Sequence, residues 1–295
     1  DAAARVGGIL ANNNFPYQFL MENMQIQNNL IEASHQSEVE KFIFLGSSCI
    51  YPKLASQPLK EDCLLTSSLE PTNEWYAIAK ITGVKACEAI RKQYKKDFVS
   101  LMPTNLYGTR DNFDLQTSHV LPAMIRKIHL AHCLKEGNWE AVRKDMNQRP
   151  VEGVNGDSSK EDILAILKKY GISETEVTLW GTGTPLREFL WSEEMADASV
   201  FVMEHVDFKD TYKEGSKDIR NCHINIGTGK EITIRQLAER IVETVGYQGK
   251  LTFDSSKPDG TMRKLTDPSK LHALGWHHKI EIEEGVQRMY EWYLK

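Results

Sequence analysis

Two short apolar runs, each preceded by a segment with helical periodicity, constrain the fold of this chain most. The runs are KFIFL at 41–45 and FVSLM at 98–102, and both have the length and composition of buried strands. The spacing of apolar residues predicts helices over 17–35 and 74–94, the second with Asn73 as its N-cap. The order helix, strand, helix, strand predicts an α/β fold with a doubly wound parallel sheet.

Residues 131–175 are polar and charged and differ from the sequence on both sides. They contain two helix-like pieces, 138–147 and 159–170, joined by the loop-like run RPVEGVNGDSS. We interpret 131–175 as an insertion that forms a weakly packed, partly helical flap, with 149–160 cut first by a protease. The other C-terminal segments predict a small α/β lobe: 177–180, 193–206, 222–229, 233–245 and 250–271.

Composition narrows the classes of function. The net charge of −5 and the lack of a long basic run argue against nucleic-acid binding and against docking on an anionic membrane. Five cysteines form no CxxC pair, and their odd number suits free thiols in a reducing compartment. No apolar run is long enough to span a bilayer. We therefore expect a soluble cytoplasmic protein with a small-molecule partner and no metal site.

Polar residues end the first predicted strand. Ser47, Ser48 and Cys49 follow it directly in FLGSSCIYPK, and the carboxyl end of a strand is where open α/β sheets bind ligands. Ser47 and Cys49 are two residues apart, so on a continuing strand their side chains would face the same side.

Tyr76 and Lys80 are four residues apart, which places them on one face of the predicted helix. A nearby ammonium favours the phenolate and would bring the pKa of Tyr76 closer to neutrality. Such a pair also arises by chance on helix surfaces, but here a serine-bearing strand end precedes it and a strand followed by PTNLYG (103–108) comes after. Serine, tyrosine and lysine in that order resemble the carbonyl-reducing residues of short-chain dehydrogenase/reductases.

A closer resemblance covers nearly the whole chain except 131–175. Successive blocks are similar to those of the GDP-L-fucose synthase family, also called GDP-4-keto-6-deoxymannose 3,5-epimerase-4-reductase. The cysteine after the double serine separates this family from the wider group of extended reductases. The blocks are AAARVGGILANNNFP (2–16), FLGSSCIYPK (44–53), EPTNEWYAIAK (70–80), MPTNLYGTRDNF (102–113), SHVLPAMIRK (118–127), WGTGTPLREFL (180–190), INIGTG (224–229) and SKPDGTMRKL (256–265).

The resemblance implies a role for each matching residue. Ser47, Tyr76 and Lys80 would be the reductase triad, and Cys49 and His119 the acid/base pair for epimerisation. The positions implied to contact NADP(H) are Leu45, Gly46, Ser47, Ser48, Tyr76, Lys80, Pro103, Thr104, Asn105, Leu106 and His119. The positions implied to hold the GDP-sugar are Lys127, Trp180, Arg187 and Lys250.

The implied reaction makes chemical sense of these residue types. A 4-keto group acidifies the protons on C3 and C5, so one site needs a base and an acid for inversion and then a hydride source for the ketone. The resemblance also implies a homodimer and a division of labour within a Rossmann-type fold. Residues 1–120, joined by 177–228, would belong to the NADP-binding domain, and 121–295 would form mainly the substrate-binding lobe, including the insertion.

Each residue also has a structural interpretation. A cysteine after a strand is usually a small buried hydrophobe, and a histidine such as His119 is usually solvated or capping. Arg187 could pair with Glu188, although a forked cation also suits a diphosphate. Trp180 could be core packing, or it could stack on a base or sugar.

One part of the family's pattern is absent from the sequence. RVGGILANN (5–13) has paired glycines but lacks the spacing of a dinucleotide-binding fingerprint and a preceding strand. Members of the family begin with a segment of roughly 60 residues that carries this fingerprint. Residue 1 matches the end of that segment, so we expect this sequence to be an incomplete record of a longer chain. The preference for NADP over NAD therefore rests on the resemblance.

Two other functions remain open. One is another NAD(P)-dependent nucleotide-sugar epimerase or dehydratase, although a dehydratase would be expected to have an acidic residue where this chain has Cys49. The other is a non-catalytic module that senses NADP or a nucleotide sugar. A sensor would not need all five candidate catalytic residues, so the sequence favours an enzyme.

Overall fold

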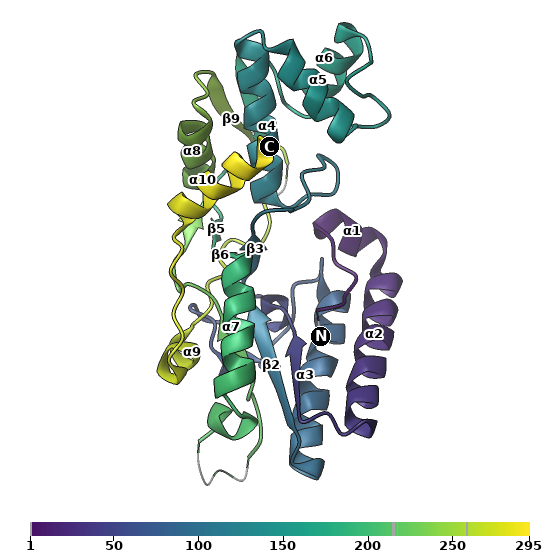
Figure 1. Ribbon diagram of the computed structural model, residues 1–295, viewed down its shortest axis with the longest axis vertical. Helices are drawn as coiled ribbons and strands as arrows, with labels where there is room; N and C mark the ends of the chain where they lie inside the picture. The colour runs from purple at the N-terminus through teal and green to yellow at the C-terminus, as the bar shows by residue number, and fades with distance from the viewer. Residues whose placement is uncertain (1, 214–215, 217, 258) are drawn as a thin grey trace. The chain divides into compact units, whose positions relative to one another are not determined.

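The computed structural model describes residues 2–213, 216, 218–257 and 259–295, and the chain forms two compact units (Figure 1). Unit 1 comprises 1–106, 188–231 and 263–280, and unit 2 comprises 107–187, 232–262 and 281–295. These boundaries differ from the predicted division at residue 120.

The return of 263–280 to unit 1 was not predicted from the sequence. Backbone hydrogen bonds explain it, because Leu59 N–H donates to Leu265 C=O at 2.7 Å and Asp267 N–H donates to Leu59 C=O at 2.9 Å. These bonds form an isolated β-bridge between Leu59 and Thr266, about 200 residues apart in sequence. Local sequence patterns do not reveal a contact at such a separation.

A parallel sheet forms the centre of unit 1. Its strands are β1 (Lys41–Leu45), β2 (Asp97–Pro103) and β7 (Ile224–Ile226), in the order β1-β2-β7. Phe42 pairs with Phe98, and Leu101 pairs with Ile224. The two predicted strands and the parallel sheet are thus confirmed.

Helices cover both faces of this sheet. On one face α2 (Pro16–Gln36) and α3 (Glu74–Tyr94) run side by side, and on the other lie α7 (Ser192–His205) and α9 (Ser269–Leu274) (Figure 1). The helices predicted at 17–35, 74–94 and 193–206 are confirmed within one residue at each end. The smaller elements are α1 (Ile9–Asn14), η1 (Ser48–Ile50), η2 (Glu61–Cys63), η3 (Phe208–Thr211), β3 (Asn105–Tyr107) and β6 (Phe189–Trp191).

The predicted N-cap of α3 is only partly correct. Asn73 occupies the cap position, but its side chain accepts no hydrogen bond from the first turn. The reason is its backbone conformation, since φ −136° and ψ 15° lie outside the extended region that aims a capping side chain at the helix.

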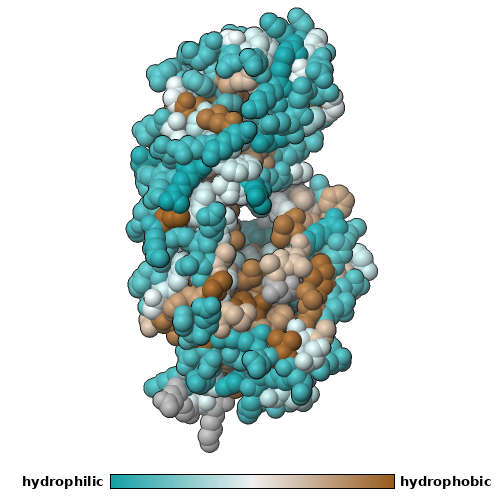
Figure 2. All heavy atoms as spheres, viewed as in Figure 1, coloured by the Kyte–Doolittle hydropathy of each residue, from teal (hydrophilic) through white to brown (hydrophobic). Residues whose placement is uncertain are grey.

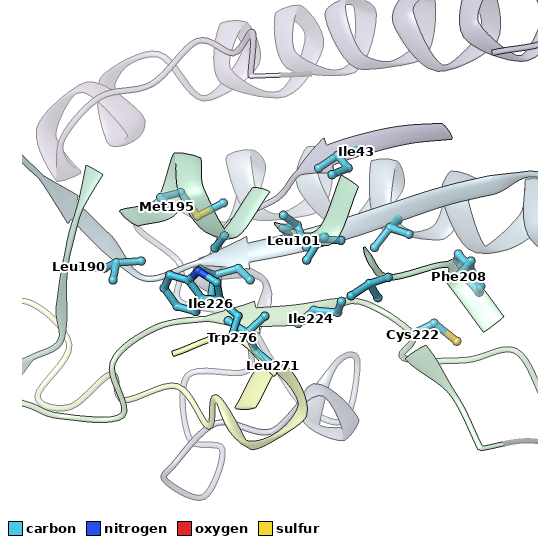
Figure 3. Close-up of a cluster of buried hydrophobic side chains, with 14 residues drawn as sticks. Ile43, Leu101, Leu190, Met195, Phe208, Cys222, Ile224, Ile226, Leu271 and Trp276 are labelled. Carbon is cyan, nitrogen blue, oxygen red and sulfur yellow. The ribbon is translucent and has the colours of Figure 1, made fainter. Parts of the chain in front are cut away.

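Alternation along the strands produces two cores, one on each face of the sheet. Ile43, Val99 and Leu101 point to the side of α7 and α9, where they pack with Met195 and Leu271 (Figure 3). The intervening residues Phe44, Phe98 and Met102 point to the side of α2 and α3. A sheet buried on both faces explains why the two predicted strands read as nearly continuous apolar runs.

Unit 2 contains two small sheets and five helices among the described residues. β4 (Glu176–Trp180) pairs in parallel with β9 (Lys250–Asp254), and β5 (Leu186–Arg187) pairs antiparallel with β8 (Ile232–Thr233). The helices predicted at 138–147, 159–170 and 233–245 are confirmed within one residue at each end. The helices are α4 (Val120–Lys135), α5 (Trp139–Gln148), α6 (Lys160–Lys169), α8 (Ile234–Val245) and α10 (Ile282–Tyr293).

The insertion is firmly packed, so the expectation of a weakly packed flap is wrong. The buried carboxylate of Asp145 on α5 accepts hydrogen bonds from Arg126 Nε on α4 at 2.9 Å, from Arg149 Nη1 at 3.2 Å and from the Tyr293 hydroxyl. Arg143 donates to the carbonyls of Gly156 and Ser158, which holds the loop predicted to be cleaved. Part of the polar sequence here is therefore paired inside the protein, as Asp145 shows.

The visible surface differs between the two units. Figure 2 shows hydrophilic side chains over most of unit 2 and a gathering of apolar side chains on unit 1 around β2 and α3. Within the described residues, no helix combines the length and apolarity needed to cross a membrane.

We predict that Asp145→Ala destabilises the protein by about 3–5 kcal/mol, because it leaves the fully buried Arg126 guanidinium without its counter-charge. Urea unfolding measures the loss. The matched control is Glu283→Ala, which removes a partner of Arg240 from an exposed pair 3.3 Å apart and should cost about 1 kcal/mol or less. Equal unfolding midpoints for the two variants would contradict the prediction.

Candidate active site

The end of β1 turns sharply and brings two candidate catalytic side chains together. Ser47 keeps an extended backbone, and its Oγ accepts a hydrogen bond from Cys49 N–H at 3.3 Å as the N-cap of the 3₁₀ turn η1. The strand therefore does not continue, and the prediction that Ser47 and Cys49 share one face of a strand is wrong. The capping bond joins the two residues instead, and the Ser47 side chain lowers the pKa of the Cys49 thiol.

Close packing of α3 on β1 places Tyr76 and Lys80 beside this turn. A Cβ on Gly83 would lie 2.3 Å from the ring of Phe44, so only glycine lets the helix approach the strand this closely. Lys80 Nζ donates to Leu45 C=O at 2.8 Å and lies 4.9 Å from the Phe44 ring centroid. The ammonium is also 5.8 Å from the ring centroid of Tyr76, as the four-residue spacing predicts.

Ser47 connects the two halves of the cluster. Its hydroxyl interacts with both the Tyr76 phenol and the Cys49 thiol, and each interaction lowers the pKa of that group. Ser47, Cys49, Tyr76 and Lys80 are therefore brought together within unit 1. The same packing explains Gly46, because a Cβ there would lie 2.2 Å from the Met102 side chain of β2.

Burial controls the protonation of this cluster. It raises the pKa of the Tyr76 phenol, an effect that the nearby Cys49 reinforces and the hydrogen bond with Ser47 opposes. The expected lowering of the Tyr76 pKa by Lys80 is therefore wrong. Burial lowers the pKa of Lys80 to about 8, against an opposing effect of Cys49. At neutral pH the phenol holds a proton that it can donate, and Lys80 is mostly a cation.

The thiol of Cys49 is neutral for the same reason. Burial raises its pKa, although the cations of Lys264 and Lys80 and the hydrogen bond with Ser47 pull it down. Lys264 was not singled out from the sequence, even though it lies in the block SKPDGTMRKL. A lysine that acts on the thiol through space leaves no mark in the spacing of the chain.

Two of the segments predicted to contact NADP(H) lie at the ends of two neighbouring strands. Residues 45–48 start at the last residue of β1, and 103–106 start at the last residue of β2 and continue into β3. The second segment is held by Thr104 N–H donating to Ile226 C=O at 3.0 Å and by Asn105 Nδ2 donating to Glu188 C=O at 2.8 Å.

Glu188 organises the neighbouring loop of unit 1. Its carboxylate is fully buried and accepts hydrogen bonds from Gly229 N–H at 2.7 Å and from the backbone and hydroxyl of Thr266 at 2.9 and 2.7 Å. A Cβ on Gly227 would lie 2.4 Å from Glu188 Oε1, which leaves room only for glycine. This carboxylate is a structural anchor at the carboxyl end of β7.

His119 and Lys127 belong to unit 2. His119 stands at the N-cap position of α4 but makes no capping hydrogen bond with its side chain, which is exposed. Burial raises the pKa of the neighbouring Asp111, and His119 is among the groups that oppose the rise. Lys127 is buried two turns along α4, and burial lowers its pKa to about 8.

Trp180 ends β4 and Arg187 ends β5, both in unit 2. Trp180 is 59% exposed, which argues against core packing, and the ammonium of Lys257 lies 5.7 Å from its ring centroid. The Arg187 guanidinium donates to the carbonyls of Leu186 and Thr261 at 2.7 and 2.5 Å. Burial lowers the pKa of Arg187, and the carboxylate of Asp259 opposes this.

The structure does not bring Lys250 to these residues. It begins β9 and pairs with Glu176, whereas Trp180 pairs with Asp254 four positions along the same ladder. Four residues of strand span about 13 Å, and Lys250 acts electrostatically on Glu176 instead.

Asp259 is the residue of unit 2 that the sequence reasoning missed. Its carboxylate accepts hydrogen bonds from Thr182 N–H at 2.9 Å and from the Thr182 hydroxyl at 2.7 Å, and it acts on Arg187. A Cβ on Gly181 would lie 2.2 Å from it. The signal was present, because the acidic residue of KPDG lies in a block that matched the family.

Comparison with known proteins agrees with this arrangement. Residues 1–149 and 150–227 match the family described as "NAD dependent epimerase/dehydratase family". The chain is 46% identical to a GDP-L-fucose synthase of Escherichia coli and 47% identical to GDP-L-fucose synthase 1 of Arabidopsis thaliana. Both alignments cover the whole chain, and they cover 79% and 76% of the two relatives.

A solved structure of a related enzyme also resembles this chain. A GDP-D-glycero-L-gluco-heptose synthase from Campylobacter jejuni, crystallised in the presence of NADPH, has a TM-score of 0.91 and 40% identity. That match covers all of this chain and 82% of the other. The family match and the identity to these relatives agree with the serine, tyrosine and lysine residues that the doubly wound sheet brings together. The chain therefore belongs to the NAD dependent epimerase/dehydratase family, within the group of GDP-L-fucose synthases.

Proposed function

We propose that this protein converts GDP-4-keto-6-deoxy-D-mannose to GDP-L-fucose by 3,5-epimerisation followed by NADPH-dependent reduction of the 4-keto group. The observation that carries the proposal is the convergence of Ser47, Cys49, Tyr76 and Lys80 at the carboxyl end of β1. One cluster thereby offers an acid for a ketone oxygen and a thiol for the neighbouring carbons. The GDP-L-fucose synthases at 46–47% identity support the same reaction.

The residues after β1 and β2 fit the nicotinamide end of NADPH. Lys80 is a buried ammonium with three N–H donors, and within the described residues its hydrogen bond goes to Leu45 C=O. The remaining N–H donors of Lys80 suit ribose hydroxyls. Residues 45–48 and 103–106 lie at the carboxyl ends of β1 and β2, where such folds bind nucleotides. When bound, NADPH supplies the hydride for the reduction.

Epimerisation requires a proton to leave C3 or C5 on one face of the sugar ring and to return on the other. We assign this exchange to Cys49 and His119 as an acid/base pair, with the adjacent ketone stabilising the charge that develops. Burial raises the pKa of the Cys49 thiol, so the thiol carries a proton that it can give to carbon, and the His119 side chain is exposed.

Reduction requires a proton at the ketone oxygen as the hydride arrives at C4. Tyr76 is suited to this role, because burial keeps its phenol protonated. Ser47, whose hydroxyl also interacts with Tyr76, orients the oxygen, and Lys80 holds the ribose and supplies positive charge.

The GDP moiety needs cations and a flat ring surface. We assign the diphosphate to Lys127 and Arg187 and the stacking contact to Trp180, whose ring is exposed. The carboxylate of Asp259 favours the charged form of Arg187, because it raises the pKa of the guanidinium against the effect of burial.

A second candidate substrate is a GDP-heptose with a 4-keto group, such as the one named in the structure of a GDP-6-OMe-4-keto-L-xylo-heptose reductase from C. jejuni, which is 41% identical to this chain. The Campylobacter jejuni GDP-D-glycero-L-gluco-heptose synthase favours it, because its fold matches this chain at a TM-score of 0.91. The residues discussed above act on the ketone and its neighbouring carbons, which the two sugars share. The two substrates differ beyond C5 of the sugar, so assaying both distinguishes them.

We further propose a cytoplasmic homodimer. All five cysteines are free, which suits a reducing compartment, and cell fractionation tests that location.

For the dimer, α2 and α3 expose apolar side chains, namely Tyr17, Leu30, Trp75 and Tyr94. Sedimentation velocity should give twice the mass of one chain, and a monomer at micromolar concentration would contradict the dimer.

We predict that Cys49→Ser and Tyr76→Phe separate the two steps. Given the 4-keto sugar and NADPH in D₂O, the full-length protein should yield GDP-L-fucose with deuterium at C3 and C5. Cys49→Ser should slowly give a reduced but uninverted GDP-deoxyhexose without that deuterium. Tyr76→Phe should keep the exchange and lose reduction by about 10²–10⁴-fold, the usual contribution of a general acid.

Product NMR and mass spectrometry measure both outcomes. Cys63→Ser is the matched control, since it is also a free cysteine in unit 1 and lies outside the cluster. Normal deuterium uptake at both carbons in Cys49→Ser would mean that Cys49 is a packed thiol without a role in the exchange.

We also predict an alkaline limit to reduction. Because burial lowers the pKa of Lys80 to about 8, Lys80 is a cation below that pH and neutral above it. The kcat/KM for reduction, which reports ionisations of the free enzyme, should fall as pH rises through about 8. In Lys80→Met the rate should be low throughout and lose this inflection. A wild-type profile that stays flat to about pH 10, where a solvated lysine titrates, would refute the prediction.

A further inference from the structure

The hydroxyl of Tyr51 lies in a buried hydrogen-bond network behind the Cys49 turn. Tyr51 is 4% exposed, and its hydroxyl lies 2.5 Å from Asn225 Oδ1 and 3.0 Å from His223 Nε2. Both partners come from the region of β7, which is two strands away from β1 in the sheet. The network therefore links the end of β1 to β7 without passing through β2.

The direction of each hydrogen bond follows from the amide of Asn225. Its Nδ2 donates to the carbonyls of Leu59 and Asp267 at 2.9 and 3.2 Å, so its Oδ1 faces Tyr51 as an acceptor. The Tyr51 hydroxyl donates to that oxygen, and its own oxygen is then free to accept from His223 Nε2–H.

His223 is neutral in this arrangement. Burial lowers its pKa to about 3, with the cations of Lys270 and Lys85 adding to the effect. A neutral imidazole with its proton on Nε2 is the tautomer that the Tyr51 oxygen requires. The direction of both hydrogen bonds at the Tyr51 hydroxyl is thus fixed: the hydroxyl donates to Asn225 and accepts from His223.

Tyr51 is also the C-cap of the turn that carries Cys49. The three-residue turn η1 begins after Ser47, which caps it through Cys49 N–H, and ends at Tyr51, whose N–H bonds back to Ser48 C=O at 3.5 Å. Cys49 lies between these two anchors. A shift of Tyr51 therefore moves the backbone that places the Cys49 sulfur.

We propose that Tyr51 is a positioning residue for Cys49, and that its hydrogen bonds to Asn225 and His223 hold the thiol where it exchanges protons at C3 and C5. The inference rests on the proposed function and adds to it a residue that is too buried to touch the substrate. Removing the hydroxyl leaves Asn225 Oδ1 and His223 Nε2–H without this partner inside the protein, which favours a shift of the ring and of the turn. Misplacement of a reacting group by about 1 Å can cost about 10²-fold in rate.

Tyr51→Phe tests the proposal through the ratio of two products. In D₂O, with the 4-keto sugar and NADPH, the full-length variant should give a ratio of inverted, deuterated product to uninverted, reduced product at least about 10-fold below wild type. The ratio does not depend on the fraction of folded protein. A purely structural role would lower both products together and leave the ratio unchanged.

Tyr290→Phe is the matched control. Tyr290 is also buried, and its hydroxyl lies 3.0 Å from Nδ1 of His129, whose pKa burial lowers to about 4, but it belongs to unit 2. Each substitution removes a tyrosine hydroxyl that lies within hydrogen-bond distance of a buried histidine. Only Tyr51→Phe should change the product ratio. If Tyr51→Phe does not fold, His223→Leu replaces it, because it removes the other partner of the hydroxyl and should shift the ratio in the same direction.

The outcomes separate the two proposals. An unchanged ratio in Tyr51→Phe, or an equal fall in Tyr290→Phe, would overturn the positioning role while wild-type deuterium uptake leaves the proposed function intact. Absence of deuterium from the wild-type product would overturn the proposed function and the positioning role together.

Discussion

The close approach of α3 to β1 is the contact on which the candidate site depends. Gly83 lets the helix touch the ring of Phe44, and Lys80 then reaches the last carbonyl of the strand at Leu45. Tyr76, one turn before Lys80, arrives beside Ser47 as a result. A larger residue at Gly83 would separate the helix from the strand, and the reductase residues would no longer meet the turn that carries Cys49.

Burial of this contact also decides its chemistry. The apolar surroundings that pack α3 on β1 raise the pKa values of Tyr76 and Cys49 and lower that of Lys80. All three shifts have one cause, because a low-dielectric environment disfavours whichever form is charged. The site therefore holds protons to donate at neutral pH, and the network behind Tyr51 keeps the thiol in place.

Much of the fold and of the site could be predicted from the sequence. The strands at 41–45 and 98–102 and the long helices were recognisable because local periodicity reports burial directly. Ser47, Cys49, Tyr76 and Lys80 were recognisable because their residue types and order resemble a known family. The packing of 131–175 was not, because a polar sequence such as that around Asp145 can be either solvated or internally paired.

The sequence by itself determined the parallel sheet, the identity of the reductase cluster and the family, since these depend on short-range patterns and residue types. Only the tertiary structure decided that the strand ends in a capped turn at Ser47, that burial opposes the expected pKa of Tyr76, and that Lys250 lies away from Trp180. Only it also revealed Asp259, Lys264 and the link from Tyr51 to Asn225. The physical reason is that desolvation and long-range contacts depend on which segments meet in space, and a linear pattern does not contain that information.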